Sequence, residues 1–224
     1  MASLLPIKIY GKTGPNPPKI AMTVRELALP HEIIYVDYSL VKTPPYTDMN
    51  PNGRLPIIED PNTGITLWES GAIIEYLVET YDKDGKLGFP KGSKEAWQAK
   101  MWLFFQVSGQ GPYYGQAHYF TKKHHEPLAF PIERYTKEIR RVTSVLEEHL
   151  KTQPKGEDGP WLVGGKFSFA DLSFVPWQYM TYHWLADVVD ITEYTLVADW
   201  IARAMKREAI GPVMPGAMTP HKGN

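Results

Sequence analysis

The sequence predicts a mixed α/β region followed by an all-helical region. Two changes along the chain of 224 residues indicate this division. Apolar residues first recur with a period of two, as in strands, and this pattern then stops after a stretch rich in glycine and proline. We place the mixed region at residues 1–84, a linker at 85–93 and the helical region at 94–224.

The mixed region begins with the order strand, helix, strand. Ile7 and Ile9 fall on one face of a predicted strand, and residues 31–38 form a second apolar run. Between the two, a helix is predicted from Pro17, because proline is tolerated in the first helical turn. A helix that connects two neighbouring strands makes those strands parallel.

The mixed region ends in a hairpin and a helix. Two short apolar runs, 55–60 and 64–70, are joined by the turn sequence PNTG. A helical pattern starts at Ser70, which we predict as its N-cap. The predicted order of the whole region is therefore β-α-β-β-β-α.

The helical region shows apolar residues at helical spacing over residues 94–109 and 133–150. Ser168 and Asp171 have the spacing of a capping box, in which each residue satisfies a backbone N–H of the other. We predict a structural role for this pair. The tail, residues 211–224, is predicted to be loop-like and loosely packed.

Composition excludes several classes of function. The chain is 43% hydrophobic and 22% charged with a formal net charge of −1, which favours an ordinary globular protein over one that binds nucleic acid or a membrane surface. It has no cysteine, so any thiol chemistry needs a thiol that a ligand supplies. No secretory signal or membrane-length apolar run is present, which predicts a soluble, cytoplasmic protein. We expect no metal site.

Three motifs occur in one order along the chain: GRLPII at 53–58, WESGAIIEYL at 68–77 and GKFSFADLSF at 165–174. Together they resemble the cytosolic glutathione transferase family, over residues 7–206. The segments TGPNPPK and NPNGRLP are similar to fungal transferases related to the yeast nitrogen-regulatory prion protein and to bacterial nu-class enzymes. The resemblance implies a thioredoxin-like first domain, an all-helical glutathione transferase C-terminal domain and a two-fold homodimer.

The resemblance also implies where the glutathione sulfur lies. In these families a Pro-Asn pair at the start of the first helix lies beside the sulfur, which implies that Asn16 stabilises the thiolate. Nu-class enzymes often carry a threonine two residues before this asparagine, where the present chain has Gly14. Thr13, one position earlier, is a further catalytic candidate. Tyr10 is another, because many other classes of the family place a tyrosine near this point. From the residues alone, Asn16 is better explained as a turn or cap residue.

Glutathione would be held along the second half of the mixed region. A helix start at Ser70 is suited to the γ-glutamyl carboxylate, and Glu69 is suited to its ammonium group. By resemblance, Pro56 is in the cis form and frees the Leu55 backbone for the cysteinyl part, while Arg54 meets a carboxylate or remains in solvent. The implied glutathione-binding residues are Arg54, Leu55, Pro56, Glu69, Ser70, Lys42 and Asn52.

The resemblance assigns the co-substrate pocket to the helical region. Residues 97–120 are rich in aromatic side chains, most of which we expect in the core or in a dimer interface. The candidates for the pocket itself are Phe105, Gln106, Tyr114 and His118.

The implied function is activation of the glutathione thiolate for conjugation to electrophiles, in detoxification. Glutathione-dependent reduction of peroxides or disulfides is a related activity. Glutathione would be a co-substrate, and no cofactor is expected. The alternative is a non-catalytic glutathione- or ligand-binding or regulatory module, because one fold can carry unrelated functions.

Overall fold

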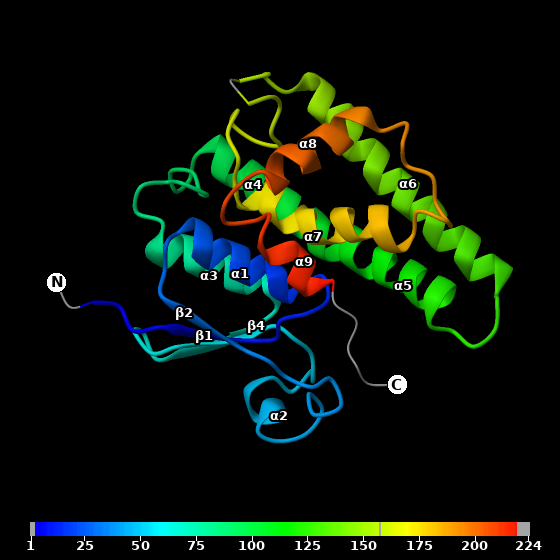
Figure 1. Cartoon of the computed structure of the whole chain (residues 1–224). Coiled ribbons are helices and arrows are strands. Elements are labelled where there is room, and N and C mark those ends of the chain that lie inside the picture. The colour runs from blue at the N-terminus through cyan, green and yellow to red at the C-terminus, as the bar shows by residue number, and fades with distance from the viewer. Residues whose placement is uncertain (1–2, 157, 219–224) are drawn as a thin grey trace. The chain divides into compact units, whose positions relative to one another are not determined.

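The computed structural model describes residues 3–156 and 158–218, and it divides into two compact units (Figure 1). Of the described residues, the thioredoxin-like unit contains 3–88 and 207–218. The helical unit is Phe89–Lys206. This division differs from the predicted one, which gave the C-terminal segment to the helical region.

The thioredoxin-like unit is built on one mixed sheet with the order β2-β1-β3-β4. β1 pairs parallel with β2, and β3 pairs antiparallel with both β1 and β4. Ile7 and Ile9 are buried, as the period of two predicts. The strands are β1 (Ile7–Tyr10), β2 (His31–Ile34), β3 (Ile57–Asp60) and β4 (Ile65–Trp68).

Helices α1 (Pro17–Glu26) and α3 (Ser70–Tyr81) pack against each other on one face of this sheet (Figure 1). The apolar side of α3, which includes Ile73 and Leu77, is fully buried. A short helix that the sequence pattern does not predict, α2 (Tyr46–Met49), lies in the irregular segment after β2. The predicted thioredoxin-like topology is confirmed.

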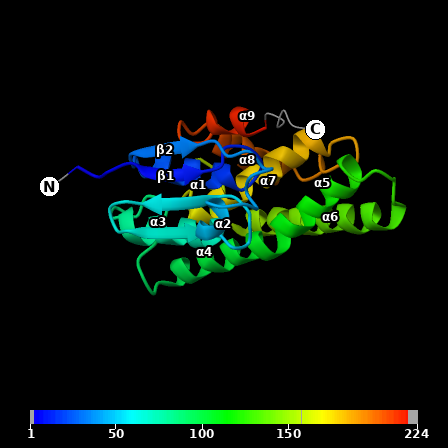
Figure 2. The same ribbon diagram turned by 90° about the horizontal axis from the view of Figure 1, so that it is seen from below.

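The helical unit contains only helices as regular elements among its described residues. α5 and α6 pack side by side, as Figure 2 shows. The predicted capping box is present at the start of α7, where the Ser168 N–H donates to Asp171 at 3.0 Å. The elements are α4 (Lys94–Phe105), the π-helical turn η1 (Gln106–Gln110), α5 (Gly111–Lys122), α6 (Ala129–Thr152), α7 (Phe169–Trp184) and α8 (Thr195–Met205).

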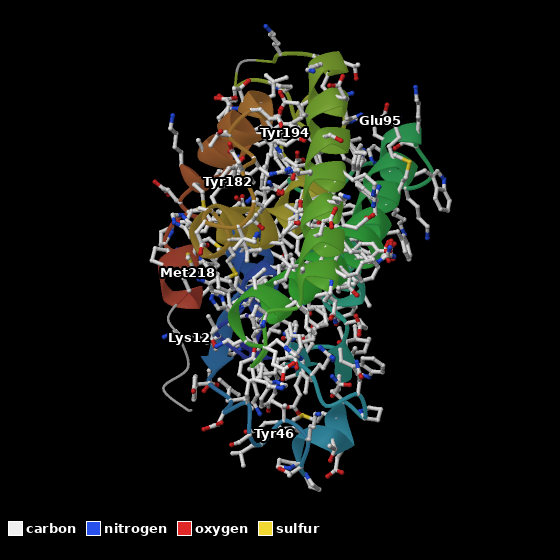
Figure 3. All side chains as sticks on the ribbon, turned by 90° about the vertical axis from the view of Figure 1, so that its right-hand side faces the viewer. Lys12, Tyr46, Glu95, Tyr182, Tyr194 and Met218 are labelled. Atoms are coloured by element: carbon white, nitrogen blue, oxygen red, sulfur yellow. The ribbon has the colours of Figure 1, made fainter. Side chains whose placement is uncertain are left out.

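The C-terminal segment returns to the thioredoxin-like unit, where α9 (Val213–Ala217) packs on α1. Met214 is fully buried, so the prediction of a loosely packed tail is wrong for residues 211–218. The Arg207 guanidinium donates to Glu26 of α1 at 2.6 Å. Residues 219–224 of the predicted tail lie outside the described residues. In Figure 3, Lys12 of the β1–α1 loop lies near the end of α9.

Among the described residues, none of the helices has the length and apolar character needed to cross a membrane.

Candidate functional site

The loop between β1 and α1 presents Asn16 at the beginning of the helix. Asn16 occupies the N-cap position of α1, and Pro17 and Pro18 follow in the first turn, as predicted. Its side chain makes no capping hydrogen bond. The amide group of Asn16 therefore lies at a helix N-terminus without serving as the cap.

Two elements of the same unit hold this loop in place. The Gly14 N–H donates to the Ala217 carbonyl of α9 at 3.0 Å, and the Tyr38 hydroxyl donates to the Thr13 carbonyl at 3.2 Å. Gly14 has φ +82°, and a Cβ atom there would lie 3.0 Å from the Tyr38 hydroxyl. A threonine at Gly14 would thus meet an unfavourable backbone conformation and a tight contact with the Tyr38 hydroxyl. Thr13 itself is buried.

Asn50 organises the loop before β3. It is 1% exposed, its Nδ2 donates to the Arg54 carbonyl at 2.7 Å, and its Oδ1 accepts the Asn52 N–H at 2.9 Å. The Leu55–Pro56 peptide bond is cis, which confirms the prediction for Pro56. The sequence analysis missed Asn50, although an asparagine beside a proline in a polar turn is a common loop-organising residue.

Glu69 and Ser70 lie where β4 turns into α3. Ser70 is the first residue of α3 and Glu69 holds the N-cap position, so the prediction of Ser70 as N-cap is wrong. Glu69 has φ +71°, in the left-handed region that residues other than glycine seldom adopt. Such strained residues cluster at functional sites. The helix start adds N–H groups that have no partner within the helix and attract anions.

These loops meet in one pocket of the thioredoxin-like unit, with a cavity volume of about 90 Å³. Its wall offers a positive group at Arg54, a negative group at Glu69, and amide and hydroxyl groups between them. Such a wall suits a ligand that carries both a carboxylate and an ammonium group. The lining residues are Asn16, Asn50, Arg54, Leu55, Pro56, Glu69 and Ser70.

The structure does not bring Tyr10, Lys42 or Asn52 to this pocket wall. The Tyr10 hydroxyl donates to Glu59, and burial together with that carboxylate raises the pKa of Tyr10 to about 12. Its ring meets Tyr46 edge-on, with centroids 6.2 Å apart. Lys42 and Asn52 are exposed. Thr13 is likewise not among the lining residues.

Lys19 is a second residue that the sequence analysis missed. It is 1% exposed, and its Nζ lies 3.4 Å from Ser70 Oγ. Burial lowers the pKa of Lys19 to about 7, and the negative charge of Glu69 opposes this change. In the sequence Lys19 stands beside the apolar face of α1, where a lysine ordinarily extends its ammonium into water. That pattern carries no signal of burial.

Two predicted co-substrate residues lie in the core of the helical unit. Gln106 and Tyr114 are both fully buried. Gln106 Nε2 donates to Gln110 Oε1 at 3.0 Å, and the Tyr114 hydroxyl lies 3.0 Å from Thr143 Oγ1. These hydrogen bonds give both residues a structural role, and their contact with a co-substrate stays a prediction.

The other two candidates are partly exposed. The Phe105 ring packs near Phe174, and the His118 ring stacks on Trp184 with centroids 5.0 Å apart. Burial, followed by the charge of nearby lysines, lowers the pKa of His118. Their place in a pocket also stays a prediction. Among the described residues, no group of three or more His, Asp or Glu side chains could hold a metal ion.

Comparison with known proteins defines the class. Residues 13–80 match the family model "Glutathione S-transferase, N-terminal domain", and residues 113–208 match "Glutathione S-transferase, C-terminal domain". The Glutathione S-transferase-like protein tpcF of Aspergillus fumigatus is 54% identical over 214 residues, which cover 94% of this chain and 95% of that protein. The chain belongs to the glutathione S-transferase family.

Solved structures agree with this assignment. The glutathione transferase URE2P6 of Phanerochaete chrysosporium, in complex with oxidised glutathione, is 40% identical, with a TM-score of 0.84 and coverage of 92% of this chain and 94% of that one. A glutathione transferase homologue of Lodderomyces elongisporus, with two glutathione molecules per subunit, is 34% identical. Its TM-score is 0.87, with 95% and 99% coverage. The predicted fungal type of transferase is thereby confirmed.

Proposed function

We propose that the protein is a glutathione transferase that binds glutathione in the pocket of its thioredoxin-like unit and joins the thiolate to small electrophiles. The observation that carries the proposal is one pocket lined by Asn16, by the loop around Pro56, and by the start of α3 at Ser70. Solved relatives such as URE2P6 bind glutathione in its oxidised form, which supports the proposal.

Each part of glutathione has a suitable partner in this pocket. The γ-glutamyl carboxylate is assigned to Ser70 and the N–H groups of α3, and its ammonium to Glu69. The cysteinyl backbone is assigned to the main chain of Leu55, and the glycine carboxylate to Arg54. With these assignments, the sulfur is proposed to lie at the Asn16 side of the pocket.

Asn16 is the proposed thiolate-stabilising residue. A thiol with a pKa of about 8.5 is only a few per cent ionised at pH 7. Lowering that pKa by about two units requires about 2.7 kcal/mol of preferential interaction with the anion. The Asn16 amide donates one hydrogen bond, and the positive end of the α1 dipole adds to it. The thiol proton leaves to solvent, the sulfur lone pair forms a C–S bond, and the leaving group departs with its bonding electrons.

The test is the Asn16→Ala variant with a model aryl halide. We expect kcat/KM to fall by about 10- to 100-fold, as for the loss of one preorganised donor to a developing anion. Affinity for S-methylglutathione should stay nearly constant, because the thioether carries no charge to stabilise. The Ser70→Ala variant is the matched control, in which KM for glutathione should rise while kcat changes little. An unchanged rate in Asn16→Ala would remove Asn16 from the mechanism.

Two further activities remain candidates at the same pocket. The Lodderomyces elongisporus homologue holds two glutathione molecules per subunit, which favours chemistry between two thiols, such as reduction of a disulfide or hydroperoxide. Non-catalytic binding is favoured by Gly14, because this position has no side-chain donor, whereas the nu-class enzymes that the chain resembles often carry a threonine there. Turnover of an aryl halide, a hydroperoxide and a mixed disulfide separates these activities. Glutathione binding without turnover of any of them would establish the binding module.

We also propose that a second copy of the chain covers α4. Trp97, Met101 and Phe104 follow the spacing of one helix face and are 67%, 56% and 61% exposed. Such an apolar stripe is typical of an interaction surface. Light scattering should give the mass of a homodimer, and Trp97→Glu should shift that mass to the mass of a monomer.

A cytoplasmic location is likewise proposed, and fluorescent tagging of the protein tests it.

A further inference from the structure

Lys19 brings a positive charge to the back of the pocket. It lies in the first half of α1, and its Nζ is 3.4 Å from Ser70 Oγ at the start of α3. The side chain is 1% exposed and does not line the pocket, whereas Ser70 does. Lys19 therefore acts on the pocket from behind Ser70 rather than by lining it.

The chemistry of the two groups orients the hydroxyl. A lysine ammonium has three N–H donors and no acceptor, and a serine hydroxyl has one donor and two acceptor lone pairs. When Lys19 is charged, Ser70 Oγ must accept from it. The hydroxyl proton of Ser70 is then free to donate to another acceptor. A neutral Lys19 amine can accept this proton, which turns the hydroxyl away from the pocket.

We propose that Lys19 is a positioning residue that directs the Ser70 hydroxyl toward the glutamyl carboxylate of glutathione and adds a positive charge behind it. This inference rests on the proposed function, because it deepens the assignment of the glutamyl subsite. It makes the subsite complementary to a zwitterion, since Glu69 faces the ammonium group and Ser70, backed by Lys19, faces the carboxylate.

The surroundings of Lys19 make its charge sensitive to a ligand. Lys19 lies on α1, and the elements that pack against α1 are α3, β1 and α9. Glu69, just before α3, is the acidic group that acts on the pKa of Lys19, and α9 has no titratable side chain. On β1, Lys8 ion-pairs with Glu59 and Tyr10 donates to it. Further along α3 the titratable side chains are Glu75, Tyr76, Glu79 and Tyr81.

Glutathione binding should therefore take up a proton. The pKa of Lys19 is about 7 because burial disfavours the charged form. A bound carboxylate favours the charged form, so affinity is highest below pH 7 and decreases above it. One coupled proton gives a loss of roughly tenfold in affinity between pH 6 and pH 8.

The experiment measures binding of S-methylglutathione by calorimetry at pH 6, 7 and 8, in buffers of different ionisation enthalpy. The thioether cannot ionise and both carboxylates stay charged in this range, and the ammonium group of the ligand is common to all variants, so the difference in proton uptake between the unaltered protein and Lys19→Met reports on Lys19. We expect the unaltered protein to take up protons near pH 7 and to lose affinity by about tenfold up to pH 8. Lys19→Met should bind about tenfold more weakly at pH 6 and show a flat profile.

A double-mutant cycle with Ser70→Ala tests the route through the hydroxyl. If Lys19 acts through Ser70, adding Lys19→Met to Ser70→Ala should cost much less than it costs alone. Lys83→Met, at an exposed lysine of the same unit, is the control and should bind as the unaltered protein does. Additive effects, or an unaltered affinity profile in Lys19→Met, would overturn the proposal.

A second measurement uses only the unaltered protein, so it does not depend on whether a variant folds. The 13C signal of the Lys19 ε-carbon in the unaltered protein should titrate near pH 7 and shift to higher pH with S-methylglutathione bound. A lysine signal that does not move with the ligand would refute the coupling. Binding without turnover would overturn only the transferase proposal, and absence of binding would overturn both.

Discussion

Two buried ionisable side chains, Asp171 in the helical unit and Lys19 in the thioredoxin-like unit, differ in the kind of groups that they contact. Both side chains are at most 1% exposed, and burial moves both pKa values toward the neutral form, upward for Asp171 and downward for Lys19. Asp171 accepts four hydrogen bonds of 2.9–3.0 Å from Leu162, Ser168 and Trp200. Lys19 lies 3.4 Å from Ser70, which faces a pocket.

The difference separates a charge that builds the fold from one that serves a site. The partners of Asp171 are backbone and core groups, so its charge joins the start of α7 to α8 and to the preceding turn. Lys19 contacts Ser70, a residue of the pocket wall, and in the proposal above its charge acts on a bound ligand. Residues of the second kind commonly reduce stability, because activity and stability make different demands on a site.

The largest expected effect follows from Asp171→Ala. This change leaves buried donors of Leu162, Ser168 and Trp200 without their acceptor, which should cost about 3–5 kcal/mol in the free energy of unfolding. Urea unfolding at pH 7 measures this loss. Asp171→Asn keeps one acceptor oxygen and should lose less, and equal losses in the two variants would show that the hydrogen bonds matter little.

Lys19→Met should change the free energy of unfolding in the opposite direction from Asp171→Ala. Replacing a buried charge by an apolar side chain of similar length should stabilise the unliganded protein by about 1–4 kcal/mol. The folded pKa of Lys19 is below its unfolded value of 10.5, so the penalty is complete below pH 7 and disappears as pH rises from 7 to 10.5. Urea unfolding at pH 6.5 and 9.5 checks this. If the Lys19→Met variant is less stable at both pH values, then Lys19, like Asp171, stabilises the fold.

Asp60 tests whether the difference between Asp171 and Lys19 depends on the unit in which each residue lies or on its contact with the pocket. It is buried in the thioredoxin-like unit but accepts hydrogen bonds from Tyr76, Tyr81 and Asn62. Burial acts to raise the pKa of Asp60, but these hydrogen bonds hold it below the ordinary value of 3.8. Asp60→Asn should cost about 1–3 kcal/mol at pH 7.

The cost of Asp60→Asn should decrease in acid. The ionised carboxylate stabilises the fold above pH 3.8, and this contribution is lost as pH decreases through the lower folded pKa. Guanidinium unfolding at pH 7 and pH 3 compares the two conditions. A pH-independent cost would mean that shape, and not charge, explains the effect.

The smallest effect is expected for an exposed charge pair. Lys137 donates to Glu133 one turn earlier on α6, and both side chains are exposed. Water and salt screen such a pair. The Glu133→Gln variant should unfold at the urea midpoint of the unaltered protein, and a clear shift would show that burial alone does not rank these charges.

Local patterns in the sequence predict much of the fold. The alternation at Ile7 and Ile9 predicts β1, and the Ser168–Asp171 spacing predicts the capping box, because both depend on residues close together in the chain. By resemblance to known transferases, Asn16 and Ser70 were assigned to one site, and the structure brings them to one pocket.

Contacts between distant segments could not be predicted in this way. The resemblance makes Tyr10 a candidate for contact with the sulfur, but its hydroxyl donates to Glu59, 49 residues further along the chain. Ser70 was predicted as an N-cap, but the turn from β4 places Glu69 there. Asn50 and Lys19 were missed because only the folded chain shows that they are buried.

By itself, the sequence determined the absence of any cysteine thiol and the order of strands and helices in the thioredoxin-like unit, apart from α2 and α9. The tertiary structure decided which charges lose water and which loops meet. It carried α9 back to α1, where Ala217 accepts from Gly14, and it buried Lys19 behind Ser70. The physical reason is that periodicity and capping act over a few residues, whereas desolvation depends on every segment that packs around a group.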